Sequence, residues 1–253
     1  MRYTISPAFN YLQEALKSAI NGFTTQGTDF VIGRRNAIKI FECNGINVNV
    51  KSFRVPNALN TIVYRFFRKS KARRSYDHAT VLLEKGIGTP APIAYFENVT
   101  AIGLKDSYYA SEHLMPDLTF RELVEIPDYP EHEIILRQFT AFSFRLHQAG
   151  IEFKDHSPGN TLIIKNAPGQ YSFYLVDLNR MNFHNAMSFD LRMENLKRLT
   201  PKQEMVAVMS SEYAALYTEK TEQEIFNTLW GKTAEFQRKF WRKRALKQKL
   251  KLK

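Results

Sequence analysis

The sequence predicts an α+β protein with a small antiparallel β-rich N-terminal lobe, residues 1–114, and a mostly helical C-terminal lobe, residues 115–253. Short runs of β-branched and aromatic residues, separated by turn signals, fill most of the first half. Longer stretches with apolar residues at helical spacing fill most of the second half. The length of 253 residues suits one large domain or two closely packed lobes.

The N-terminal lobe is expected to contain one small sheet and a helix that packs on it. The Asn44-Gly45 dipeptide, favoured in two-residue hairpins, separates the second and third strands. Gly86 stands where a helix C-cap would lie. The expected elements are a helix at 7–20, strands near 28–33, 37–42 and 46–53, a helix at 71–85, and strands within 88–98 and 105–114.

The C-terminal lobe is expected to begin with a hinge exit at 115–120. A long amphipathic helix follows within 132–150, because Ile135, Phe139, Phe142 and Leu146 form one apolar stripe; Gly150 ends it. The remaining expected elements are short strands at 161–165 and 172–177, then two or three helices over 187–253.

Composition is ordinary for a soluble protein, with 44% hydrophobic and 24% charged residues. No apolar run approaches the roughly 18 residues needed to span a bilayer. The N-terminus also lacks the apolar core of a signal peptide. Cys43 is the single cysteine, so we expect no internal disulfide and a cytoplasmic location. His147, His156 and His184 fit no metal-ligand spacing and are expected to be structural.

The net charge of +11 is concentrated at the C-terminus, where residues 238–253 carry nine Lys or Arg and no acid. Such a segment attracts anionic lipid or nucleic acid. Lysine alternates with leucine and accompanies Phe240 and Trp241, which suits an interfacial membrane contact. A solvated helix end is the alternative, and nothing besides charge favours nucleic acid, so no nucleic-acid partner is expected.

The stretch FKDHSPGNTLII, residues 153–164, places two oxygen-bearing side chains five residues apart, Asp155 and Asn160. Asp177 is expected to end the next strand, and a hairpin of this size would bring it close to Asn160. Carboxylate and amide oxygens suit Mg²⁺, which takes one or two carboxylates plus substrate phosphates. Phosphotransfer enzymes place a catalytic-loop acid, a metal-binding Asn and a second metal-binding Asp in this order. Asp155 would then be the acid that receives a proton.

The N-terminal lobe supplies a candidate phosphate-binding lysine. Lys51 lies on the third strand in VNVKSF, comparable to the V-A-I-K lysine of kinases, and Lys39 is a weaker rival. Such a lysine needs an acidic partner on the following helix. We expect this partner to be Asp77, with Glu84 as the alternative, although Glu84 is only two residues from the glycine that ends the helix.

The stretch YASEHL, residues 109–114, matches a hinge next to a nucleotide. Ser111 would be the gatekeeper, and backbone groups of Glu112 and Leu114 would hydrogen-bond adenine.

Four stretches together resemble the protein-kinase-like superfamily, and more narrowly the bacterial lipopolysaccharide core kinases that act on Kdo and heptose. They are VNVKSF, SYDHATVLLEKGIGTPAPIAYFE, LHQAGIEFKDHSPGNTLI and YLVDLNRMNF, within residues 28–185. The resemblance implies a two-lobed protein-kinase-like fold and ATP and Mg²⁺ as cosubstrates. The implied acceptor is a sugar hydroxyl of the lipid A–core region, phosphorylated by an enzyme that is cytoplasmic and peripheral at the inner membrane.

Several departures from the kinase pattern narrow the prediction. Phe153 and Lys154 replace the His and Arg of H-R-D, and no A-P-E motif follows. The first β-turn carries one glycine, Gly33, and two arginines in place of a glycine-rich loop. Gly33 is a candidate nucleotide-binding residue, and Arg34 or Arg35 would contact phosphate directly. These departures favour a glycolipid or small-molecule kinase over a regulated protein kinase. The rivals are a soluble kinase for a sugar, antibiotic or protein, and a catalytically inactive kinase-like binding module.

Overall fold

The computed structural model describes residues 1–32, 36–54, 69–100 and 103–251. The chain forms two compact units, one of Met1–Met115 with Asp177–Arg180, the other of Pro116–Val176 with Met181–Lys253. The sequence predicts that all of residues 115–253 belong to the second lobe. In the structure the short segment Asp177–Arg180 packs with the first unit instead, which places the predicted metal ligand Asp177 beside the N-terminal sheet.

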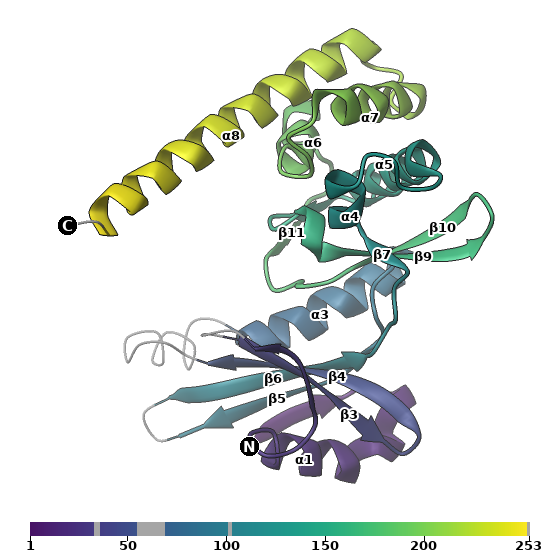
Figure 1. Cartoon of the computed structure of the whole chain (residues 1–253). Helices are drawn as coiled ribbons and strands as arrows, with labels where there is room; N and C mark the ends of the chain where they lie inside the picture. Colours follow the sequence, from purple (N-terminus) through teal and green to yellow (C-terminus); the bar gives the residue numbers. More distant parts are fainter. Residues whose placement is uncertain (33–35, 55–68, 101–102, 252–253) are drawn as a thin grey trace. The chain divides into compact units, whose positions relative to one another are not determined.

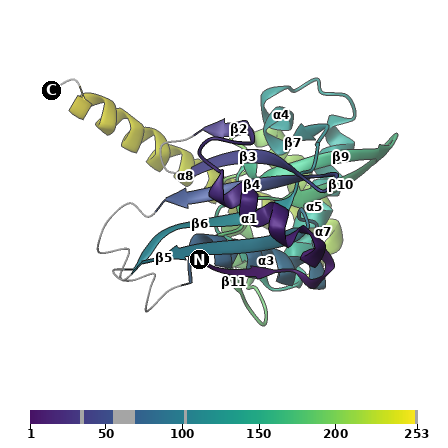
Figure 2. The ribbon, with the colours of Figure 1, turned by 90° about the horizontal axis from the view of Figure 1, so that it is seen from below.

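The first unit is built on one six-stranded antiparallel sheet with the order β1-β5-β6-β4-β3-β2. Its elements are β1 (Arg2–Ile5), η1 (Pro7–Leu12), α1 (Gln13–Asn21), β2 (Thr28–Ile32), β3 (Asn36–Cys43), β4 (Ile46–Arg54), α3 (Lys71–Glu84), β5 (Pro92–Val99) and β6 (Leu104–Glu112). Figure 1 shows α1 and α3 on opposite faces of the sheet, and Figure 2 shows α1 in front of it from below.

Side chains on the two faces of β4 have different surroundings, as the alternation of side chains along a strand predicts. Val48 and Val50 are fully buried in a core that includes Leu12 and Leu16 from the α1 side. Lys51 lies on the other face, where α3 packs on β4, β5 and β6. The hydrophobic core on one side of the sheet therefore holds β4 in place. The opposite side presents the candidate phosphate-binding lysine, Lys51.

The hairpin predicted at Asn44-Gly45 is confirmed. Both residues have positive φ, 49° and 84°, as a two-residue type I′ turn requires. The helix predicted at 7–20 is confirmed only in its second part, α1; its first part, Pro7–Leu12, is a 3-10 segment, within which Phe9 is non-helical with φ −118° and ψ 15°. β1 was not predicted, because its four residues become a strand only by pairing with the distant β5.

The second unit is mostly helical. Its elements are β7 (Leu118–Thr119), α4 (Phe120–Glu125), α5 (His132–Gln148), β8 (Ile151–Phe153), η2 (Pro158–Asn160), β9 (Thr161–Ala167), β10 (Gln170–Leu175), β11 (Met181–Phe183), α6 (Phe189–Leu196), α7 (Gln203–Leu216) and α8 (Glu222–Lys251). Two small sheets, β10-β9-β7 and β11-β8, lie beside the helices.

The apolar stripe predicted on α5 is confirmed as the core of this unit, because all four of its residues are buried. Phe139 is central to it: its ring centroid lies 4.2 Å from that of Phe120 and 5.6 Å from that of Phe173. Gly150 has φ +74°, and a Cβ there would lie 2.0 Å from the His184 carbonyl oxygen. Only glycine therefore lets the chain leave α5 and enter β8, which leads into the FKDHSPGN loop.

One strand near the candidate site differs from the prediction in its bounds, whereas the number of C-terminal helices lies within the predicted range. The strand expected at 172–177 ends at Leu175, because Asp177 has left-handed backbone geometry with φ +61°. The C-terminal region holds three helices, and the last, α8, has 30 residues. Its C-terminal end extends past α6 and α7 in Figure 1.

Candidate active site

Lys51 of β4 forms an ion pair with Asp177 within the first unit. Its Nζ atom lies 2.5 Å from Oδ1 of Asp177, and the lysine side chain is only 14% exposed. The ammonium group also lies 5.3 Å from the ring centroid of Phe53, two residues along the same strand face. The structure therefore joins two sequence-predicted site residues that are 126 positions apart.

The backbone at Asp177 is held in an uncommon conformation. A φ of +61° at a residue other than glycine costs on the order of 1–3 kcal/mol and persists only when neighbouring contacts enforce it. Two such contacts are present. Asn179 donates from Nδ2 to Asp177 Oδ1 over 2.9 Å, and His78 of α3 donates from Nδ1 to the Leu178 carbonyl over 2.7 Å. These bonds direct the carboxylate toward Lys51.

His78 is a site residue that the sequence pattern does not reveal. A carbonyl oxygen can only accept, so the His78 ring carries its proton on Nδ1. Burial lowers the pKa of His78, which keeps the ring neutral at physiological pH. The sequence pointed to the right helix and to the adjacent residue, but helical periodicity does not reveal which side chain meets a loop 100 residues away.

The predicted pairing of Lys51 with Asp77 is wrong in this structure. Asp77 Oδ2 lies 2.7 Å from Lys69 Nζ and 3.9 Å from Arg73 Nε. Glu84, the alternative partner, is the exposed last residue of α3. The acid that meets Lys51 comes from the chain beyond β10, a long-range contact that no local pattern specifies.

The strand register places apolar side chains beside Lys51. Ile38 of β3 is directly opposite Lys51, and Val31 of β2 is directly opposite Ile38, so all three lie on one face. Val31 is 48% exposed. An apolar, partly open strip formed by Ile38 and Val31, next to a largely buried lysine, is suited to the nucleobase of a nucleotide whose phosphates contact that lysine. Gly33 and the two arginines after it, the other candidate contacts, lie outside the described residues.

The backbone at the end of β6 offers a free donor. The Glu112 N–H donates to the Ala91 carbonyl, and the His113 N–H donates to the Asn47 carbonyl, so both are used within the sheet. The Leu114 N–H makes no hydrogen bond within the described part of the chain. The predicted adenine contact through Leu114 is thus compatible with the backbone bonding.

In the second unit, the FKDHSPGN loop begins at the end of β8 and is held by its own asparagine. Asn160 donates from Nδ2 to the Asp155 carbonyl over 2.8 Å, which leaves Asn160 Oδ1 as the remaining acceptor. The Asn160 carbonyl accepts from the N–H of Val176, the residue before Asp177. Asn160 is therefore fixed in orientation with one oxygen available.

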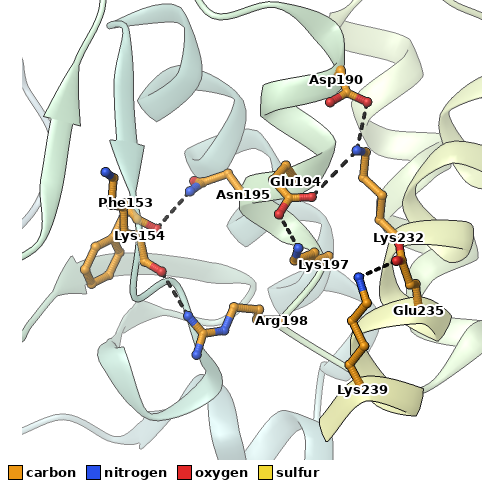
Figure 3. Close-up of polar contacts among 10 residues, drawn as sticks. All are labelled: Phe153, Lys154, Asp190, Glu194, Asn195, Lys197, Arg198, Lys232, Glu235 and Lys239. Atoms are coloured by element: carbon orange, nitrogen blue, oxygen red, sulfur yellow. Dashed lines mark hydrogen bonds and ion pairs between the residues drawn. The ribbon is translucent and has the colours of Figure 1, made fainter.

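Asp155 has a cationic neighbour from the segment after α6. Arg198 Nη1 lies 3.7 Å from Asp155 Oδ1, and the carboxyl side chain is 21% exposed. The same Nη1 donates to the Lys154 carbonyl over 3.0 Å, as Figure 3 shows. A pocket of about 240 Å³ opens beside this loop, lined in part by Lys154, Asn195 and Arg198. Asp155 itself does not line this pocket; its carboxylate is partly exposed and lies beside the positive charge of Arg198.

Comparison with known proteins identifies the fold. No family model matches the sequence, and no curated protein matches it. A solved structure of WaaP in complex with acyl carrier protein is similar, with a TM-score of 0.65 and 18% identity; the match covers 94% of this chain and 98% of that chain. This chain has the fold of WaaP. The predicted α+β, protein-kinase-like architecture is confirmed by this match.

The side-chain oxygen atoms of Asp177 and Asn160 are of the chemical type that binds Mg²⁺. Asp177 supplies a carboxylate and Asn160 an amide oxygen, both hard donors of the kind that magnesium takes alongside water and phosphate oxygens. No cluster of three or more His, Cys, Asp or Glu side chains able to hold a metal occurs among the described residues. A magnesium ion bound by Asp177 in the first unit, or by Asn160 in the second, would therefore need further ligands from a nucleotide or from water.

Two buried histidines, His147 on α5 and His156 within the FKDHSPGN loop, make folding sensitive to acid. Burial lowers the pKa of His147 to about 3 and that of His156 to about 4. Both folded values lie below the unfolded value of 6.5, so the unfolded chain binds more protons between these limits. Their contribution to stability is complete above pH 6.5 and decreases as the pH falls toward 4.

We expect the free energy of unfolding to fall by about 2 kcal/mol per buried histidine between pH 8 and pH 5. Urea unfolding at several pH values measures this, and His147→Gln should remove one histidine's share of the slope. His113→Gln, at a half-buried position in the first unit, is the control and should retain the slope. A wild-type stability that is flat from pH 8 to pH 5 would contradict this prediction.

Proposed function

We propose that this protein is an ATP- and Mg²⁺-dependent phosphotransferase. The observation that carries the proposal is the Lys51–Asp177 ion pair, built into a WaaP fold beside an apolar strip and an unused backbone N–H. A mostly buried ammonium group directed at a strained aspartate is poorly explained as a packing feature, because structural ion pairs do not require left-handed backbone geometry. It is well explained as a preorganised phosphate and metal site.

Each half of the proposed site has a separate task. In the first unit, Lys51 orients the α- and β-phosphates, Asp177 offers a metal-binding oxygen, and the backbone of Glu112 and Leu114 binds adenine. In the second unit, Asn160 offers the second oxygen. A bound magnesium ion would neutralise charge that develops on the transferred phosphoryl group. Asp77 remains a candidate only as a secondary charge near the nucleotide, since its carboxylate is already paired with Lys69.

Asp155 is the residue that acts on the acceptor. Its carboxylate accepts the proton of the attacking hydroxyl or orients that hydroxyl toward the γ-phosphate. Arg198, 3.7 Å away, limits the directions in which the carboxylate can point. Catalysis is then mainly placement and electrostatic stabilisation, without a covalent enzyme intermediate.

The proposed acceptor is a sugar hydroxyl of a lipopolysaccharide core or lipid A precursor, reached from the cytoplasmic side of the inner membrane. Its support is the motif resemblance to lipopolysaccharide core kinases together with the WaaP fold. A soluble sugar, an antibiotic or a protein is the alternative acceptor class. The other alternative is a catalytically inactive module that binds its ligand without transferring phosphate.

The deciding experiment incubates purified protein with γ-labelled ATP, Mg²⁺ and a Kdo–lipid A acceptor. Transfer of label to the lipid is expected, and omission of Mg²⁺ or acceptor should abolish it. Transfer to a soluble sugar in place of the lipid would support the alternative acceptor class. Absence of both Mg-ATP binding and transfer would favour the inactive module.

The C-terminal part of α8 supports a peripheral membrane role. Every residue from Arg238 to Lys249 is exposed, and so are the large side chains of Phe240, Trp241 and Leu246. Within the described residues, no helix combines the length and the apolar character needed to cross a bilayer. We propose that this exposed basic helix contacts an anionic membrane surface.

Removing two charges from this helix is expected to weaken binding to anionic vesicles. The double variant Lys243→Gln/Lys247→Gln should lose about 2 kcal/mol, roughly thirtyfold in affinity, because each lysine near an anionic surface contributes about 1 kcal/mol. Vesicle co-sedimentation at fixed salt measures this. The matched double variant Lys85→Gln/Lys105→Gln, at exposed positions in the first unit, should bind like wild type.

Equal binding by both double variants would remove the membrane role and leave the kinase proposal intact. The solved WaaP structure contains acyl carrier protein, so that protein belongs in the same assay as a second ligand. Loss of acyl carrier protein binding without loss of vesicle binding would assign the basic helix to a protein partner.

A further inference from the structure

Three consecutive carbonyl groups lead up to and include Asp155, and each accepts a hydrogen bond from a different side chain. Asn160 binds the Asp155 carbonyl and Arg198 binds the Lys154 carbonyl. The third donor is Asn195 of α6, whose Nδ2 lies 2.8 Å from the Phe153 carbonyl (Figure 3). Two of these donors, Asn195 and Arg198, come from α6 and the segment just after it, so this part of the second unit holds the backbone that leads to Asp155.

The orientation of Asn195 is determined by a chain of buried hydrogen bonds. Asn195 Oδ1 lies 3.2 Å from His147 Nε2, and His147 Nδ1 lies 2.9 Å from the Tyr213 hydroxyl. Arg192 Nη1 lies 3.4 Å from the same hydroxyl. Arginine can only donate, so the Tyr213 oxygen accepts from it and directs its own proton to His147 Nδ1.

This order of donors allows one position for the His147 proton and one orientation of the Asn195 amide. With Nδ1 accepting from Tyr213, the neutral His147 ring carries its proton on Nε2 and donates it to Asn195 Oδ1. The Asn195 amide must then direct its NH₂ group at the Phe153 carbonyl. Arg192, His147, Asn195 and Tyr213 are all buried, with at most 7% of each side chain exposed, so water does not substitute for these bonds.

The chain of bonds keeps one protonation state across the physiological range. Burial lowers the pKa of His147 to about 3 and raises the pKa of Tyr213 to about 12, so neither changes charge near neutral pH. Arg192 is held in turn by the Met187 carbonyl over 3.0 Å and by Gln148 Oε1 over 2.8 Å. The direction of the hydrogen bonds is therefore fixed at both ends of the chain, by Arg192 at one end and by the Phe153 carbonyl at the other.

We propose that Asn195 is a positioning residue for the reaction and that Arg192, Tyr213 and His147 set its orientation. The inference rests on the proposed function, because it takes Asp155 as the catalytic aspartate that accepts a proton from the acceptor hydroxyl. Asn195 touches neither substrate nor reacting atoms; it acts through the Phe153 carbonyl on the backbone that carries Asp155. Displacement of a catalytic group by about 1 Å is enough to reduce turnover about a hundredfold.

The first test replaces Asn195 with aspartate, which keeps the acceptor for His147 and removes the donor to Phe153. We expect kcat to fall about 10- to 100-fold with an unchanged KM for ATP, since the predicted nucleotide contacts lie in the first unit. Asn166→Asp is the matched control: Asn166 is exposed and donates to Ser172 Oγ on the β9–β10 hairpin. Equal kcat in wild type and Asn195→Asp would overturn the proposal.

The second test avoids a buried charge and so remains informative if Asn195→Asp does not fold. His147→Gln retains an N–H donor toward Asn195 Oδ1, whereas His147→Leu does not. A kcat retained by the glutamine variant and lost by the leucine variant, at similar thermal stability, would support the orienting role. Equal losses in both variants would count against it.

A spectroscopic measurement separates this inference from the proposed function. ¹⁵N-labelled histidine NMR should show His147 as the neutral Nε2–H tautomer in wild type, and Tyr213→Phe should disturb it. The His156 N–H, which donates to the Phe153 carbonyl over 3.0 Å, should exchange faster with solvent in Asn195→Asp than in Asn166→Asp. If no acceptor is ever phosphorylated, the proposed function fails while these two readouts still decide whether Asn195 holds the loop. Unchanged exchange at His156 or the Nδ1–H tautomer would overturn the inference.

Discussion

Asp155→Asn is expected to lower kcat by about 10²- to 10⁴-fold while Mg-ATP still binds. The range is that of a general base or a proton-accepting group removed from a phosphotransfer site. Asparagine keeps the size of the side chain but cannot take a proton from the acceptor hydroxyl. The backbone contacts of the loop should survive, because Asn160 and Arg198 bond to main-chain carbonyls and not to the carboxylate alone.

Steady-state transfer of labelled phosphate measures the effect, and equilibrium binding of a non-hydrolysable ATP analogue checks that the nucleotide site is intact. Asp190→Asn is the matched control: Asp190 is 76% exposed and its carboxylate pairs with Lys232, 2.7 Å away. Full activity in Asp155→Asn would remove Asp155 from the mechanism, whereas loss in both variants would indicate a folding defect.

Lys51→Met is expected to reduce kcat/KM for ATP by about 10²- to 10³-fold, comparable to the loss of a preorganised charge contact in other active sites. Methionine occupies a similar volume without the ammonium group, so the phosphates would lose their positive contact. The Asp177 carboxylate would also lose its partner at 2.5 Å, which weakens the contacts that hold its left-handed backbone.

Lys39→Met is a close control for this substitution. Lys39 lies on the neighbouring strand, its side chain is also 14% exposed, and it pairs with Asp29 at 3.4 Å. Its register partner is Val50, so it lies on the opposite face of the sheet from Lys51. Equal losses in Lys39→Met and Lys51→Met would mean that sheet stability, and not phosphate binding, explains the effect.

Asp77→Asn distinguishes the observed ion pair from the predicted one. Because Lys69 and Arg73 already neutralise Asp77, we expect a much smaller loss of activity than in Lys51→Met. A loss as large as that of Lys51→Met would show that Asp77 replaces Asp177 as the lysine partner during turnover.

The alternation of residue types along β4 and the periodicity of α5 were sufficient to predict which faces are buried. Val48 and Val50 on one side and Lys51 on the other follow directly from strand geometry. The FKDHSPGN stretch likewise placed Asp155 and Asn160 on one loop, since five residues of chain cannot separate them far. Such predictions succeed because the residues involved are close to one another along the chain.

The sequence by itself determined the fold class, the hairpin at Asn44-Gly45 and the candidate residue types of the site. Tertiary structure alone decided which residues meet: Asp177 and not Asp77 at Lys51, His78 at Leu178, and Asn195 at Phe153. Local patterns report burial and turn geometry, which depend on neighbouring residues. Pairings across 42 to 126 positions depend on how whole elements pack, and no period in the sequence encodes that.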